Sequence, residues 1–180
     1  MVMQLGFLFD EDLCVGCRAC ESACVSENQN PAGVQFRKVT ETSPHTFLSM
    51  SCNHCDSPEC FRVCPQRAFT KKQDGIVKIN PDRCDGCGIC ITACPFHGPQ
   101  FNPQDHKVMK CQLCSSRLQA GLSPACVTAC HTGALKMIKL GGDLENGTST
   151  TLPGFPDIRL TRPSIRFRPK RSTQKTWFLS

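Results

Sequence analysis

The residues of this sequence that could do chemistry are its cysteines, of which there are 16 in 180 residues. All of them fall into four sets of four, called motifs I to IV in chain order. The motifs are Cys14-x2-Cys17-x2-Cys20-x3-Cys24, Cys52-x2-Cys55-x4-Cys60-x3-Cys64, Cys84-x2-Cys87-x2-Cys90-x3-Cys94 and Cys111-x2-Cys114-x11-Cys126-x3-Cys130. Cysteines at this density form disulfides, bind zinc or bind iron–sulfur clusters, and their spacing separates these three uses.

The spacing favours iron–sulfur clusters. Motifs I and III have the C-x2-C-x2-C-x3-C run of bacterial-type ferredoxins, and Pro95 follows motif III as proline does in those proteins. Three thiolates on one tight loop can reach three irons of a cubane, whereas a tetrahedral zinc site gives no reason for a third cysteine two residues later. Disulfides usually accompany a secretory signal peptide, which residues 1–10 do not resemble. The motifs therefore predict four [4Fe–4S] clusters.

Strand-like runs around the motifs indicate which motifs pair. Between motifs II and III, residues 68–72 and 76–79 are joined by Gln73-Asp74-Gly75, which is a hairpin signal. A strand-like run at residues 5–9 precedes motif I, and another at residues 134–138 follows motif IV. Motifs II and III therefore form one ferredoxin-like unit, and motifs IV and I form a second unit whose hairpin is opened into chain ends.

The predicted fold class is α+β and dominated by its cofactors, with two nested bacterial-ferredoxin-like units, short hairpins, short helices and long connecting loops. Residues 1–50 and 103–140 form the outer unit, residues 51–102 form the inner unit, and residues 141–180 form a basic tail that docks a partner. Residues 28–50 and 141–163 are predicted to be loops because they are rich in Gly, Pro, Asn and Thr. Hydrophobic residues seldom run together, so the bound metal must supply much of the folding free energy.

The fourth cysteine of each motif follows the first turn of a helix and faces the neighbouring cluster, so each cluster takes its fourth ligand from the paired motif. The predicted ligand sets are Cys14, Cys17, Cys20 and Cys130 (set A); Cys111, Cys114, Cys126 and Cys24 (set B); Cys52, Cys55, Cys60 and Cys94 (set C); and Cys84, Cys87, Cys90 and Cys64 (set D). His54 and His131 could each replace a ligand. The cysteine count is already complete, so we expect both histidines beside a cluster or at the surface.

The charge is uneven along the chain. The formal net charge is +6, but four cubanes with their thiolates add about −8, so the loaded protein carries about −2. Residues 158–180 contain no acidic residue and seven basic ones, which are Arg159, Arg162, Arg166, Arg168, Lys170, Arg171 and Lys175. Such a segment could bind nucleic acid or an anionic membrane, or could be a solvated tail. Ile165, Phe167, Trp177 and Phe178 need an apolar surface, which favours a segment lying along a partner subunit, and nothing else supports nucleic-acid binding.

Several stretches resemble the iron–sulfur subunit of membrane-bound dimethyl sulfoxide reductase and, more broadly, the polyferredoxin subunits of molybdopterin oxidoreductases. They are the motif order, the x11 gap of motif IV, Ser51-Cys52-Asn53-His54-Cys55, the run from Cys94 to Asn102, and Leu160-Thr161-Arg162-Pro163-Ser164-Ile165. Some relatives have Trp at the second cysteine of motif III and assemble a [3Fe–4S] cluster there. This chain has Cys87, so four cubanes are expected. His131 replaces the proline that some relatives have after motif IV, which bears on the local potential.

The resemblance implies a non-catalytic subunit that connects a molybdopterin catalytic subunit to an integral membrane anchor oxidising a quinol. The sequence contains no Ser-His-Asp set, phosphate loop or dinucleotide fingerprint, and no segment long and apolar enough for a membrane span. The resemblance therefore implies attachment to the membrane through partner subunits, at the outer (periplasmic) face, with a cytoplasmic location as the alternative. Two other functions stay open, an iron–sulfur subunit of a formate dehydrogenase or hydrogenase-type complex and a soluble polyferredoxin.

Overall fold

The computed structural model of the chain describes residues 4–141 and 147–171. Its strands form one three-stranded sheet and three hairpins, and the longest helix has 10 residues. The elements in chain order are β1 (Gln4–Asp10), α1 (Ala19–Asn28), β2 (Arg37–Ser43), β3 (Thr46–Ser51), α2 (Glu59–Arg62), β4 (Phe69–Lys71), β5 (Val77–Ile79), α3 (Ile89–Ala93), β6 (Gln100–Asn102), β7 (Lys107–Met109), α4 (Ser115–Gln119), α5 (Ala125–Thr128), β8 (Leu135–Leu140) and β9 (Ile165–Arg168). A small mixed α and β fold with short elements is therefore confirmed.

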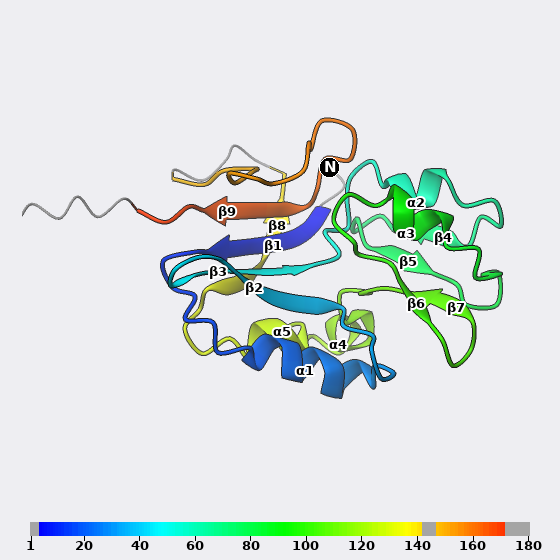
Figure 1. The fold of residues 1–180 in the computed structure, drawn as a ribbon, viewed down its shortest axis with the longest axis horizontal. Coiled ribbons are helices and arrows are strands. Elements are labelled where there is room, and N and C mark those ends of the chain that lie inside the picture. Colours follow the sequence, from blue (N-terminus) through cyan, green and yellow to red (C-terminus); the bar gives the residue numbers. More distant parts are fainter. Residues whose placement is uncertain (1–3, 142–146, 172–180) are drawn as a thin grey trace, which may run out of the picture.

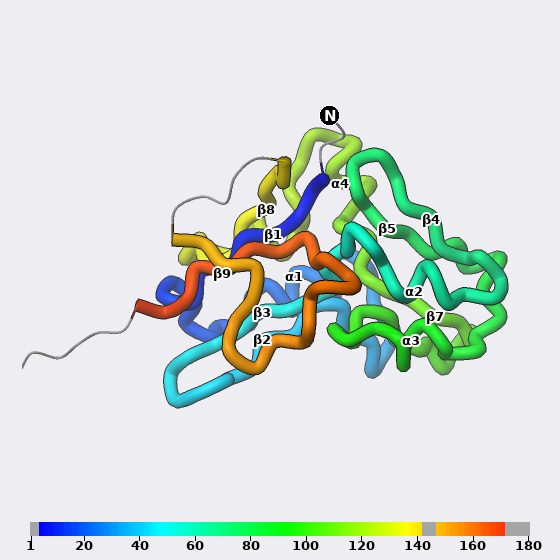
Figure 2. The backbone as a smooth tube through the Cα atoms, turned by 90° about the horizontal axis from the view of Figure 1, so that it is seen from above, coloured from blue at the N-terminus to red at the C-terminus, as the bar shows by residue number. Residues whose placement is uncertain are grey.

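The two ends of the described chain meet in the three-stranded sheet, whose order is β8–β1–β9 (Figure 1). β1 and β8 run antiparallel, with Phe9 opposite Leu135. This confirms that the strand before motif I pairs with the strand after motif IV. β9 runs parallel to β1 on its other side, with Phe7 opposite Ile165. Figure 2 shows from above how β9 lies beside β1.

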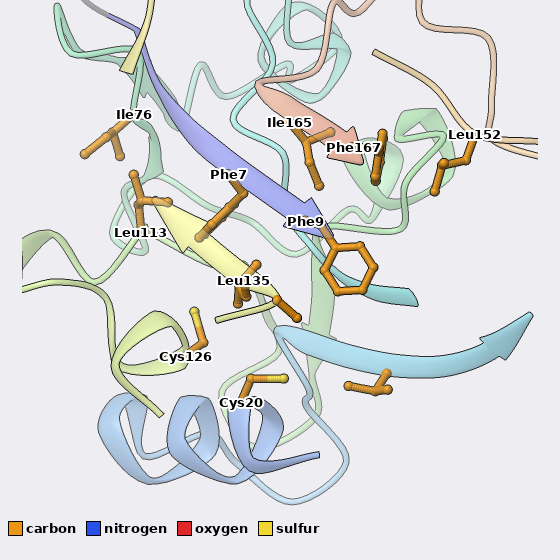
Figure 3. Packing of buried hydrophobic residues seen from close by; sticks show 12 residues of the cluster. Phe7, Phe9, Cys20, Ile76, Leu113, Cys126, Leu135, Leu152, Ile165 and Phe167 are labelled. Carbon is orange, nitrogen blue, oxygen red and sulfur yellow. The ribbon is translucent and has the colours of Figure 1, made fainter. Parts of the chain in front are cut away.

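The expectation that the apolar residues of the basic tail pack on a partner was wrong for Ile165 and Phe167, which lie in β9. Ile165 and Phe167 are 2% and 0% exposed and pack with Phe7, Phe9 and Leu135 in the main core (Figure 3). The apolar surface they need is therefore the chain's own sheet, because alternate residues of a strand point to the same face. Trp177 and Phe178, which were expected to need a partner's surface as well, lie outside the described residues.

Several basic side chains of the same segment have carboxylates of this chain nearby. The pairs are Arg162 with Asp56 at 2.9 Å, Arg171 with Asp12 at 3.4 Å, Arg168 with Asp10 at 4.0 Å and Arg159 with Asp157 at 2.6 Å. Part of the positive charge that looked available for a partner thus lies beside acidic groups near the start of the chain and in motif II. Lys175 falls outside the described residues.

The inner unit contains α2, α3 and two hairpins, which lie together at one side of the molecule (Figure 1). β4 and β5 pair antiparallel with Phe69 opposite Ile79, and this confirms the hairpin predicted between motifs II and III. β6 and β7 form a second hairpin, and Val108 of β7 packs in the core of this unit. The boundary expected at residue 102 therefore falls inside a hairpin, with Val108 in the core of the inner unit and Met109 packed against Cys24, Val34 and Phe36.

Residues 28–50 contain a hairpin where a loop was predicted. β2 and β3 pair antiparallel, with Arg37 opposite Ser51 and Val39 opposite Ser49. Arg37 and Val39 are buried, while Lys38 between them and Thr40 after them are exposed, which is the alternation of a half-buried strand. The loop prediction was wrong for these residues because polar and charged residues hid this alternation. The hairpin covers the flank of the outer unit, where α1 and α5 also lie (Figure 1).

Candidate iron–sulfur centres

The loops of motifs I and III depend on glycine. Gly16 and Gly86 follow the first cysteine of their motif by two residues and have φ values of 69° and 77°. A side chain at this backbone conformation is strained, and a Cβ at Gly86 would lie 2.1 Å from the carbonyl oxygen of His106. These glycines let the chain turn sharply between the first two cysteines, as the spacing of the motif requires.

Set C lies around one cavity. Cys52 and Cys55 come from the loop after β3, Cys60 from α2 and Cys94 from the end of α3, and all four line the cavity. Burial raises the pKa of the Cys60 thiol to about 12, and the negative charges of Cys52 and Cys94 add to the rise. The structure thus brings together three cysteines of motif II and the fourth of motif III.

Set D shows the converse pairing. Burial raises the pKa of Cys90 to about 11, and repulsion from Cys64, Cys84 and Cys87 contributes to the rise. Cys64 belongs to motif II, yet it lies close enough to Cys90 of motif III to raise the pKa of that thiol. The exchange of fourth cysteines between clusters stays a prediction, with which this interaction agrees.

In sets A and B the fourth cysteine likewise interacts with thiols of the paired motif. Burial raises the pKa of Cys14 in set A, and Cys20, Cys130 and Cys17 add to the rise while the backbone N–H of Gly16 opposes it. In set B, burial raises the pKa of Cys24 to about 12, and repulsion from the thiolates of Cys126 and Cys114 adds to the rise. Burial likewise raises the pKa of Cys111, with Cys126 contributing.

Interactions between sets define their order. Since electrostatic interaction falls with distance, a thiolate that raises the pKa of a thiol in another set marks a neighbouring set. The pairs are Cys20 with Cys126, Cys111 with Cys52, and Cys60 with Cys90. They join A to B, B to C and C to D, so the four sets form a row. All four cysteines of set B are buried, whereas Cys17 of set A and Cys87 of set D are exposed.

Backbone amides point at the fourth cysteines. The N–H groups of Ala68, Gly98 and Leu135 donate to the Sγ atoms of Cys64, Cys94 and Cys130 at 3.3 to 3.4 Å. Each of these three cysteines follows the end of a short helix, so the chain turns and brings a later amide to the sulfur. Cys24 differs because α1 continues past it, and the side-chain amide of Asn28 donates instead, at 3.6 Å. Such hydrogen bonds orient thiolate ligands and tune cluster potentials.

Polar groups without partners face the cavity of set C. The side chains of Asn53, His54 and Thr161 line it, and each has a buried polar atom with no hydrogen-bond partner among the described residues. Nδ1 of His54 accepts the N–H of Val77 at 3.1 Å, which leaves Nε2 as the ring atom that carries hydrogen. Burial, and then the charge of Lys110, lowers the pKa of His54 well below its usual value, so the ring is neutral.

These polar groups and the four thiols fit a [4Fe–4S] cluster, whose sulfides would accept the hydrogen bonds that the groups lack. Among the described residues, no three Cys, His, Asp or Glu side chains converge closely enough to hold one metal ion. A cubane does not need side chains that converge on one ion, because each thiolate binds a different iron. His131 is exposed, so the two histidines occupy the two kinds of position expected for them.

Sequence reasoning missed several residues at these centres. Arg37 and Lys110 are buried cations between the sets, and Ser49 lies with its Oγ 3.4 Å from the Sγ of Cys20. Thr161 reaches set C from the segment before β9, far from any motif. The one usable signal was the alternation of Arg37 and Val39 with exposed residues. The contacts of Lys110 and Thr161 depend on tertiary structure and left no local pattern.

Known protein families match both regions that carry these centres. The 4Fe-4S dicluster domain family matches residues 43–140, and the 4Fe-4S binding domain family matches residues 7–24. The protein is thus, as a class, an iron–sulfur protein of the ferredoxin type.

Similar proteins narrow the class. The probable anaerobic dimethyl sulfoxide reductase chain YnfG of Escherichia coli (strain K12) is 34% identical, over 98% of this chain and 94% of its own length. The B subunit of polysulfide reductase from Wolinella succinogenes is 34% identical over 99% and 95%. The thiosulfate reductase electron transfer subunit PhsB of Salmonella typhi is 42% identical over 76% and 77%. This chain therefore belongs to the family of iron–sulfur subunits of dimethyl sulfoxide reductase-type enzymes.

Proposed function

We propose that this chain is the electron-transfer subunit of a terminal reductase, carrying electrons through four [4Fe–4S] clusters from a quinol-oxidising membrane anchor to a molybdopterin catalytic subunit. Sets A to D would hold one cluster each. The reductase names of the relatives favour this function over a formate dehydrogenase or hydrogenase-type complex and over a soluble polyferredoxin.

The row of cysteine sets is the observation that carries the proposal. The sets at its two ends are those with exposed cysteines, and exposed apolar side chains lie beside them, with Val15 near Cys17 at 60% and Ile89 near Cys87 at 45% exposure. Exposed apolar groups at both ends suit contact with two different proteins. The buried middle suits conduction without contact with water.

The chain's own residues would supply position, insulation and tuning. Bound [4Fe–4S] clusters supply one-electron sites at low potential. The cysteines fix where these sites lie, and the short helices and hairpins keep neighbouring sets adjacent. The amides of Ala68, Gly98 and Leu135 orient three ligand thiols. No residue of this chain is assigned a catalytic role, and the chemistry of the terminal acceptor belongs to the catalytic subunit.

The same proposal extends to location. No helix among the described residues is long and apolar enough to cross a bilayer. We place the subunit at the membrane through its partners, at the outer (periplasmic) face. Protease treatment of intact and of permeabilised spheroplasts tests this, because protection before permeabilisation would contradict an outer location.

The two ends of the row can be tested separately in the assembled complex. Val15→Glu at set A and Ile89→Glu at set D should each slow electron exchange with one partner by at least about tenfold, because a charge at a desolvated contact weakens docking by one or more kcal/mol. Iron content should stay unchanged. Reduction by a quinol analogue and reoxidation by acceptor, followed optically, would tell the two steps apart. Lys139→Glu, at an exposed position of β8, is the control. If both variants slow the same step, or neither slows any, the row does not connect two partners.

A further inference from the structure

Two cations are buried in the middle of the row of cysteine sets. Arg37, the first residue of β2, is 2% exposed, and Lys110, between β7 and Cys111, is 1% exposed. They are the lysine and arginine side chains that are buried among the described residues. A buried cation without a negative partner is costly, so each needs a counter-charge.

Arg37 finds only neutral protein partners within hydrogen-bond reach. Its Nη1 donates to the carbonyl oxygen of Ser49 at 3.2 Å and to the Oγ of Ser49 at 3.0 Å, and its Nη2 donates to the Oγ of Ser51 at 2.8 Å. The guanidinium lies 4.7 Å from the centre of the Phe7 ring. Its Nε has no partner among the described residues, and none of the ion pairs found there includes Arg37.

Lys110 is placed in the same way. Its Nζ donates to the carbonyl oxygen of Cys111 at 2.8 Å and to that of Val77, and it lies 3.5 Å from the Sγ of Cys52. No carboxylate within the described chain pairs with it. The ammonium therefore touches set C through Cys52 and lies beside set B through Cys111.

Each cation lies between two sets. Burial alone would lower the pKa of Arg37, but the negative charges of Cys126, Cys111, Cys20 and Cys24 outweigh it and raise the pKa. These four thiolates belong to sets A and B. Lys110 is placed by geometry, because its Nζ lies 3.5 Å from the Sγ of Cys52 in set C and the next residue in the chain is Cys111 of set B.

Arg37 also acts on set A through the hydroxyl of Ser49. Arginine can only donate hydrogen bonds, so the Oγ of Ser49 accepts from Arg37 and keeps its own hydrogen for another partner. The Sγ of Cys20 lies 3.4 Å from that oxygen. Arg37 thereby orients a hydroxyl donor towards a ligand of set A while its charge faces set B.

We propose that Arg37 and Lys110 are the internal counter-ions of the row, with Arg37 serving the clusters of sets A and B and Lys110 those of sets B and C. Reduction adds a negative charge to a cluster, and a fixed positive charge in a low-dielectric interior stabilises it. Both cations therefore raise the reduction potentials of the clusters they separate. Set B lies between both cations, and set D has no buried cation beside it among the described residues, so it is an internal reference.

The inference rests on the proposed four-cluster function, and one experiment separates the two. Lys110→Met and Arg37→Gln remove the charges, Lys110→Arg and Arg37→Lys keep them, and Lys38→Met removes an exposed charge from the residue next to Arg37. The holoprotein in its complex is titrated with reductant and followed by EPR, with iron measured on every sample. If the unmutated protein lacks iron for four clusters, the proposed function fails. If it holds four clusters, the proposed function stands, and the reduction potentials of the variants test only the counter-ion role of Arg37 and Lys110.

The expected pattern is specific. Each charge-removing variant should shift two clusters to more negative potential, changing the ratio of reduced to oxidised cluster at least tenfold at a fixed potential, or about 59 mV for one electron. The cluster of set B should shift in both charge-removing variants, and the cluster of set D should shift in neither. In Lys38→Met and in the charge-keeping variants, the ratio of reduced to oxidised cluster should stay within a few-fold of its value in the unmutated protein.

Unchanged potentials with complete iron would overturn the inference, as would an equal shift of all four clusters. If Lys110→Met or Arg37→Gln loses iron, the iron content of the corresponding charge-keeping variant decides between a role of charge and a role of packing. Retention of iron in Lys110→Arg or Arg37→Lys supports a counter-ion, and loss of iron there as well would show that packing, not charge, is what the site requires.

Discussion

At the scale of single residues, each set of cysteines combines thiols from two motifs. Cys64 illustrates this, because it lies two residues after the end of α2 and its charge contributes to the raised pKa of Cys90. Its neighbour in the sequence, Cys60, interacts more strongly with Cys52 and Cys94 than with Cys90. A fourth cysteine is thus close in sequence to one set and close in space to another.

This arrangement makes Cys64→Ser a sharp test of the proposed ligand sets. The substitution should alter the EPR signal and potential of the cluster of set D and leave that of set C in place, since serine is a poorer ligand at the position it replaces. Cys60→Ser is the matched control and should alter the cluster of set C. If both substitutions affect the same cluster, the exchange of fourth cysteines is wrong.

The polar atoms around set C give a second residue-scale prediction. Thr161→Val keeps the shape of the side chain but removes a hydroxyl that faces the cavity without a protein partner. Because a hydrogen bond to cluster sulfur favours the reduced state, the potential of one cluster should fall, changing its reduced-to-oxidised ratio about two- to tenfold. Thr161→Ser is the control, and a redox titration by EPR measures both. No shift in Thr161→Val would mean that the hydroxyl does not reach the cluster.

At the scale of elements, β9 ties the end of the described chain to its beginning. Ile165 and Phe167 fill the core beside Phe7 and Phe9, and the segment before β9 brings Thr161 to set C. β9 is therefore part of the scaffold of the outer unit, although the sequence around it is basic and contains proline.

Two truncations separate this scaffold from the remaining tail. A chain ending at Asp157 loses β9 and should fail to retain iron, since removing a buried Phe side chain alone costs about 3–5 kcal/mol. A chain ending at Arg171 keeps every described element and should retain its iron, while weakening co-purification with a partner subunit if residues 172–180 dock there. Iron analysis and pull-down of the complex measure both. Normal assembly of the chain ending at Arg171 would remove the docking role of the tail.

The sequence predicted those elements whose patterns are local. The hairpin of β4 and β5 was visible from Asp74-Gly75 between strand-like runs, and β1 and β8 from their positions around motifs I and IV. β2 and β9 were missed because Arg37, Arg166 and Arg168 obscured the alternation of strand residues. Which fourth cysteine meets which set was argued from spacing, but the buried charges between sets depend on tertiary packing and could not be read from any motif.

At the scale of the whole molecule, the nested order of the motifs makes a row of four sets. In the proposed pairing of I with IV and II with III, sets A and B belong to the outer unit and sets C and D to the inner unit. The two units meet where Cys111 lies near Cys52 and where Lys110 is buried. A single polypeptide thus offers two exposed ends and a buried middle, the layout that electron transfer between two partners requires.

The four-cluster proposal is tested most directly by the iron, acid-labile sulfide and electron content of the anaerobically purified protein. Four [4Fe–4S] clusters predict about 16 irons, about 16 sulfides and about four electrons taken up per chain in a reductive titration. EPR of the reduced protein should show interacting spins, because neighbouring sets are close. Zinc in place of iron, or iron and electrons sufficient for only two clusters, would contradict the central claim.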